Sequence, residues 1–251
     1  MLNQLKMHLN TLVRRKYVYV IGVVFFIIPI ISSFFAQMMM DVSKKSFVSS
    51  LNVETLESMF GSDIASSTLG VIVGIMAAIY FTRMISTGFI KNIASTVKNR
   101  SVIGFSIVIA FTLISCIYIL VSMGGTLFAY KFIYNADIPI GTLSALPLYF
   151  LYNLLFVIGS IIFAVTIAVV TKSNNIAILT IVVVNFFSNE ILSMVSRFLP
   201  FDVLDYSMWH AYGQAGINFS SQWITGGLSA LIVIVVGSIV SYYFLNKKDL
   251  I

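Results

Sequence analysis

The sequence predicts an all-α polytopic membrane protein with six transmembrane helices. Of its 251 residues, 59% are hydrophobic and only 10% are charged, and the mean hydropathy is +1.00. A soluble domain of this length could not cover so much apolar surface with so few charges. In addition, apolar runs of about 20 residues, the length that a helix needs to cross a bilayer core, recur along the chain.

Six apolar segments are the expected transmembrane helices: 17–36, 67–86, 102–123, 144–171, 176–199 and 223–245. Each should be helical, because lipid offers backbone polar groups no partner outside the segment. The first is longer than the apolar core of a secretion signal and no small-residue cleavage site follows it, so we expect a retained anchor. Pro147 is expected in the first turn of the fourth helix. With no repeat or linker, residues 1–251 should form a single transmembrane domain.

The loops differ in charge. If the N-terminus is cytoplasmic, eleven of the 15 Lys and Arg residues lie on the cytoplasmic side and eight of the nine acids lie outside. Because Lys and Arg are retained on that side, we expect a multi-pass protein of the plasma membrane with both termini cytoplasmic. This topology also accounts for the net charge of +6, which in a soluble chain would suggest a nucleic acid. No nucleic-acid partner is expected.

Residues 1–16 precede the first apolar run and have the pattern of an amphipathic helix. The apolar stripe is Leu2, Leu5, Leu9, Leu12 and Val13, and the basic residues Lys6, Arg14, Arg15 and Lys16 lie off it. We expect this segment to lie in the cytoplasmic interface of the lipid bilayer. The alternative is a frayed basic tail.

Residues 82–101 form a basic loop without an acid, enclosed by two apolar runs. Within it Phe89, Ile90, Ile93 and Val97 are spaced as one face of a short helix, and Gly88 allows the chain to turn at its start. A short cytoplasmic helix of this kind either lies on lipid headgroups or inserts into a groove of a cytoplasmic partner.

The sequence Gly88-Phe89-Ile90-Lys91-Asn92-Ile93-Ala94-Ser95, followed by Arg100, resembles a segment of the type-2 ABC exporter permeases. In that family the segment follows the second of six spans, and an interfacial helix precedes the first. The resemblance implies a coupling helix that docks on an ATP-binding subunit. The docking residues it implies are Gly88, Phe89, Ile90, Lys91, Ile93, Val97 and Arg100.

By this resemblance the chain is a permease whose motor is a separate pair of ABC ATPase subunits, which hold ATP and Mg. A second permease subunit, a copy or a sister chain, would complete the translocation path. The expected cargo is an amphipathic peptide, such as an antimicrobial peptide, or a hydrophobic small molecule.

No catalytic site, metal site or cofactor is expected on this chain itself. It has no G-x-x-x-x-G-K-[ST] phosphate-binding motif, and its two histidines, His8 and His210, lack the spacing of metal ligands. Cys116 is the single cysteine, so no disulfide forms within the chain.

Glu190 is the one acid expected at membrane depth, where a charge is costly. Asn185, Ser188 and Asn189 share roughly its face on a straight helix. These four residues either line a substrate path, or make helix–helix hydrogen bonds while Glu190 extends toward the outer surface.

Two further features leave alternatives open. Gly70 and Gly74 form a G-x-x-x-G motif, which marks contact with a second membrane subunit or packing within this one. The alternatives to a permease are a stand-alone membrane immunity or scaffold protein without an ATPase, an intramembrane enzyme, and a secondary transporter, although the spans show no paired, Gly- or Pro-broken helices at matching positions. An enzyme would need a cluster of polar residues at membrane depth.

Overall fold

The computed structural model describes residues 2–42, 60, 64–89, 101–138, 140–198, 207–208 and 221–246. All regular secondary structure within these ranges is helical, and they contain no strand. The helices are α1 (Leu2–Val13), α2 (Lys16–Val42), α4 (Ile64–Ser86), α6 (Ser101–Phe132), α7 (Ile140–Thr171), α8 (Asn174–Ser196) and α10 (Ser221–Asn246). Five of them are long and apolar enough to cross a membrane, or six if the bent α8 is one span. The prediction of an all-helical chain is therefore confirmed, and five or six of its helices could span a membrane.

The membrane-length helices extend past their predicted bounds at one or both ends, as α6 and α7 illustrate. α6 continues to Phe132, nine residues past the predicted end at 123, and α7 begins at Ile140 rather than 144. Pro147 consequently lies inside α7 and not in its first turn, so the prediction for this residue was wrong. Proline has no backbone N–H, and it leaves the carbonyl of Leu143 without its usual helical donor.

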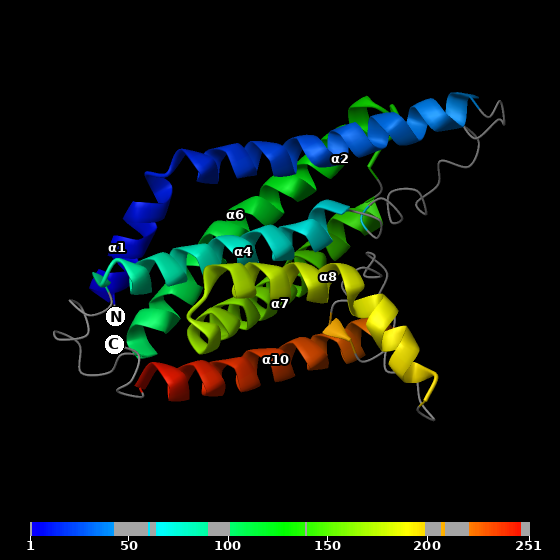
Figure 1. The fold of residues 1–251 in the computed structure, drawn as a ribbon. Helices are drawn as coiled ribbons and strands as arrows, with labels where there is room; N and C mark the ends of the chain where they lie inside the picture. Colours follow the sequence, from blue (N-terminus) through cyan, green and yellow to red (C-terminus); the bar gives the residue numbers. More distant parts are fainter. Residues whose placement is uncertain are drawn as a thin grey trace.

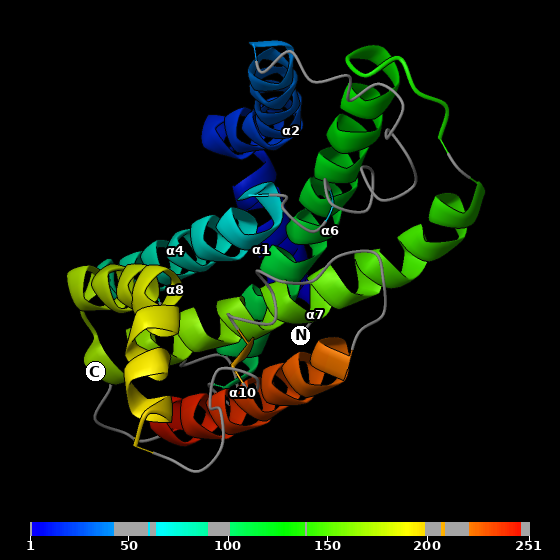
Figure 2. The same cartoon turned by 90° about the vertical axis from the view of Figure 1, so that its right-hand side faces the viewer.

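The helices form a bundle with α4, α6 and α7 at its centre (Figures 1 and 2). α2 packs on α6 at one side, α10 packs on α7 at the other, and α8 covers α4 and α7. The apolar windows of the three central helices are 56–61% buried, against 22% for α2 and 17% for α10. The outer helices therefore present most of their apolar surface to whatever surrounds the protein.

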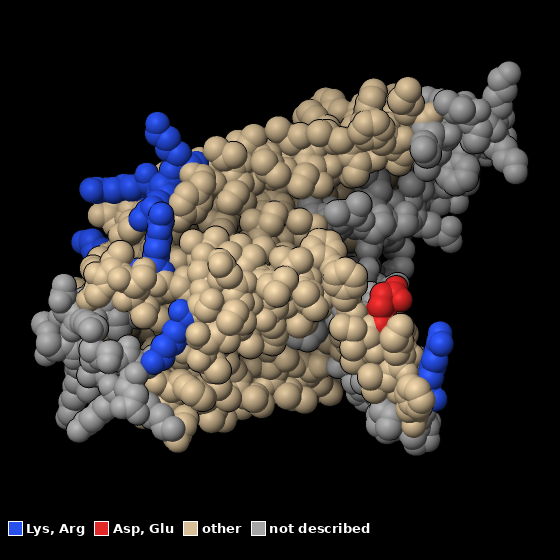
Figure 3. All heavy atoms as spheres, viewed as in Figure 1, with Lys and Arg blue, Asp and Glu red and all other residues tan. Residues whose placement is uncertain are grey.

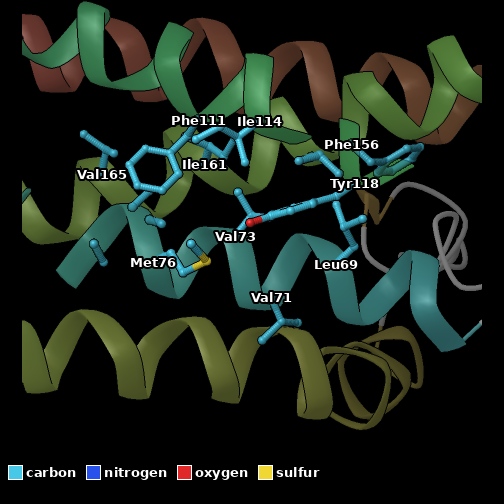
Figure 4. Packing of buried hydrophobic residues seen from close by; sticks show 14 of the residues in the cluster. Leu69, Val71, Val73, Met76, Phe111, Ile114, Tyr118, Phe156, Ile161 and Val165 are labelled. Atoms are coloured by element: carbon cyan, nitrogen blue, oxygen red, sulfur yellow. The ribbon is translucent and has the colours of Figure 1, made fainter. Parts of the chain in front are cut away.

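The core lies where the three central helices meet (Figure 4). Val73 of α4, Phe111 of α6 and Ile161 of α7 are all fully buried there. A methyl group built on Gly74 would lie 3.5 Å from both the Ala164 Cβ atom and the Ser160 carbonyl oxygen of α7. Of the two interpretations of the G-x-x-x-G motif, the structure therefore favours packing within this chain for Gly74.

Charged side chains separate along the bundle (Figure 3). Lys and Arg gather at the end where α1 begins and α10 ends, here called the basic end. The second part of α8, Glu190–Ser196, lies at the opposite end (Figure 1). The bundle therefore has the charge asymmetry that the loop composition predicts.

Candidate functional site at the basic end

The site begins with α1, whose inner face differs from the predicted stripe. His8 and Leu12 are completely buried and Leu5 and Leu9 are half-buried, whereas Leu2 is 80% exposed. The buried positions follow the i, i+3, i+4, i+7 spacing of one helix face. α1 is thus a helix packed on α6 and α2 through a face that contains a histidine.

His8 joins α1 to α4. Its Nδ1 atom lies 3.0 Å from the hydroxyl oxygen of Tyr80, and the two rings meet edge to face at 5.7 Å. Tyr80 in turn packs edge to face on Phe111 of α6. Burial lowers the pKa of His8 to about 4, so its imidazole is neutral at pH 7. The Nε2 atom has no hydrogen-bond partner among the described residues.

A cavity of about 520 Å³ opens beside this contact. Its walls come from α1, from the start of α2 and from the end of α4. Most lining side chains are apolar, but Arg15, which precedes α2, and Arg83 of α4 also line it. Such a cavity is of the size that holds small-molecule ligands.

α4 ends at this cavity with a turn that redirects the chain. The Thr87 N–H donates to the Arg83 carbonyl at 3.0 Å and the Gly88 N–H donates to the Ile85 carbonyl at 3.1 Å. Gly88 has a φ of 71°, a left-handed conformation that glycine adopts without steric cost. The turn that the sequence predicts at Gly88 is therefore present.

Phe89, the next residue, is half-buried, packs against the core and lines the cavity. Gly88 and Phe89 are thus the two predicted docking residues that the structure places, both at the basic end. The others, Ile90, Lys91, Ile93, Val97 and Arg100, lie outside the described residues.

The second predicted set lies on α8, which bends by 60° between its segments Asn174–Phe187 and Glu190–Ser196. Asn185 is half-buried and its Nδ2 donates to the Ile181 carbonyl at 2.8 Å. Glu190 follows the bend and is exposed. Ser188 and Asn189 belong to the helical backbone at the bend. Asn185 and Glu190 therefore do not lie on one straight helix face.

In the part of the chain that the structure describes, no group of three or more His, Cys, Asp or Glu residues could hold a metal ion. Comparisons with protein-family models and with curated proteins give no match for this chain. These comparisons therefore assign the chain to no family.

Proposed function

We propose that this chain is the permease subunit of an ATP-binding-cassette exporter and forms the path for an amphipathic peptide or a hydrophobic small molecule. The observation that carries the proposal is the sequence Gly88 to Ser95, followed by Arg100, directly after a membrane-length helix. The left-handed turn at Gly88 supports it, because this turn ends α4 among the basic residues where a cytoplasmic subunit would approach.

In this proposal the protein lies in the plasma membrane. Its basic end and both termini face the cytoplasm. The support is the clustering of Lys and Arg where α1 starts and α10 ends, since basic residues are retained on the cytoplasmic side. α1 then lies at the level of the inner lipid headgroups.

Partner ATPase subunits would supply the free energy by binding ATP with Mg and closing on each other. Residues 86–98 connect α4 with α6, so a push on this segment would tilt both helices. α4 packs on α7 at Gly74, which would carry the motion into the centre of the bundle. ATP can shift the equilibrium between inward-open and outward-open states only by binding one of them more tightly.

The test replaces Ile93 with aspartate, a charge that a buried apolar contact does not tolerate. We expect Ile93→Asp to reduce the amount of P-loop ATPase that copurifies with the tagged full chain by at least tenfold, as measured by mass spectrometry. The control is Val13→Asp, which puts the same charge at an exposed apolar residue of α1 at the same end. ATPase recovery that is the same in both variants would refute the docking role and favour a stand-alone membrane protein.

A further inference from the structure

The cavity between α1, α2 and α4 has two chemically different parts. Arg15 and Arg83 provide two positive charges, and no acidic residue is among the described residues that line it. The remaining wall is mainly aliphatic and aromatic, and includes Ile21, Met76 and Ile79. A ligand that satisfies both parts must carry a negative charge and an apolar chain.

Arg15, which precedes α2, and Arg83, in the last turn of α4, lie at matching ends of two membrane-length segments. The membrane-length segment of α2 begins at Lys16, directly after Arg15, and that of α4 ends at Ser86, three residues after Arg83. Both guanidinium groups therefore belong at the boundary of the apolar layer, where phospholipid phosphates lie. Among the described acids, Asp41 lies in the last turn of α2, Asp137 follows α6 and Glu190 begins the second part of α8. None of them lies at the end of α2 or α4 that carries these arginines.

The apolar wall extends from this boundary into the membrane-length segments. Ile21 is six residues beyond Arg15 in α2 and Met76 is seven residues before Arg83 in α4, which corresponds to about 10 Å of helix. An acyl chain whose headgroup sits at the arginines would run along this wall.

We propose that this cavity is a binding site for an anionic phospholipid of the surrounding membrane. The phosphate lies between Arg15 and Arg83, and one acyl chain lies against Ile21, Met76 and Ile79. Arginine suits this role because its guanidinium group donates two parallel hydrogen bonds to phosphate oxygens. A small soluble anion would satisfy the arginines but leave the apolar wall uncovered. The site is independent of the proposed transport function, because it needs no ATPase.

Native mass spectrometry of the purified full chain in a neutral detergent tests the proposal. Phosphatidylglycerol is the probe, phosphatidylcholine is the neutral lipid for comparison, and inorganic phosphate is the free anion. We expect retained phosphatidylglycerol, affinity for phosphatidylcholine lower by about tenfold, and no displacement of the bound lipid by millimolar phosphate. Displacement by phosphate would overturn the lipid assignment and indicate a free-anion site.

Two double variants separate the cavity from the general positive charge of this end. Arg15→Gln with Arg83→Gln removes both cavity charges and should weaken phosphatidylglycerol binding by about thirtyfold. Arg14→Gln with Lys16→Gln removes the same net charge from exposed neighbours that do not line the cavity, and should change binding by less than threefold. Equal losses, or no loss in either, would refute the site.

A charge-neutral variant provides a check that does not depend on the arginines. Ile21→Trp adds volume to the apolar wall from a half-buried position and leaves every charge in place. We expect it to reduce lipid retention at least tenfold while the size-exclusion profile and helical circular dichroism remain unchanged. Retention equal to that of the unmodified chain would contradict the acyl-chain half of the proposal.

Discussion

His8 shows how one side chain can hold a helix onto a bundle. It is completely buried, it contacts Tyr80 through both a hydrogen bond and a ring contact, and its other nitrogen has no partner among the described residues. A neutral imidazole tolerates this environment, whereas an imidazolium would be a desolvated charge. Attachment of α1 should therefore depend on pH.

Acid should release α1 from the bundle. The pKa of His8 is about 4 in the folded protein against an ordinary 6.5, so the released helix binds a proton more readily. Docking then weakens as pH falls from 6.5 to 4, by up to about 3 kcal/mol. A spin label at Asn10→Cys in a Cys116→Ser background should become more mobile over this range, because Asn10 is exposed on α1.

The control for this titration carries His8→Phe with the same label. Phenylalanine has no group that binds a proton, so label mobility in the control should be independent of pH. A similar acid transition in His8→Phe would show that another group causes it.

The sequence contained the signal for His8, although the apolar stripe alone did not reveal it. His8 is three residues after Leu5 and four before Leu12, so it lies on the inner face once the helix is drawn around these residues. The cavity was not predictable in this way, because it depends on how α1, α2 and α4 are placed in space. Sixty-seven residues lie between Arg15 and Arg83 in the sequence, and no local pattern connects the two.

At the scale of whole helices, adjacent glycines in α6 have opposite environments. A methyl group on Gly125 would lie 2.6 Å from the carbonyl oxygen of Phe26 in α2, which is too close for any real contact. A methyl group on Gly124 would have no neighbour within 4 Å. The α2–α6 contact therefore requires a glycine at one position and only tolerates it at the other.

Gly125→Ala should accordingly force α2 away from α6, and we expect it to destabilise the protein by about 1–3 kcal/mol. Gly124→Ala, the matched control, should be neutral or stabilising by up to about 1 kcal/mol, since alanine is the better helix former. Thermal unfolding in detergent compares the two variants. Equal midpoints would show that the close approach of the helices does not contribute to stability.

The helices themselves were largely predictable, and their ends were less so. Every predicted span overlaps a helix, because membrane-length apolar runs have few other structures open to them. The predicted end of α6 at 123 precedes the Gly124-Gly125 pair, which looks like a break but lies inside the helix against α2. The 60° bend of α8 occurs without a proline, so the sequence did not predict it.

The whole molecule is polarised, with its described Lys and Arg residues mostly at one end of the bundle and the part of α8 that holds Glu190 at the other. In a membrane such a protein has one favoured orientation, since moving basic loops across the bilayer is opposed during insertion. The orientation decides which end an ATPase could reach and which leaflet supplies lipid to the cavity. The proposed docking of an ATPase depends on this orientation, whereas the lipid site needs only an adjacent leaflet.

Thiol labelling of intact cells measures this orientation. In a Cys116→Ser background, Ser86→Cys marks the exposed end of α4 at the basic end, and Ser193→Cys marks the half-buried far part of α8. A membrane-impermeant maleimide should label position 193 and not position 86 in intact cells, and should label both after permeabilisation. The permeabilised sample is the control for reactivity. Labelling of position 86 from outside would place the basic end outside the cell. An ATPase that uses cytoplasmic ATP could not reach it there.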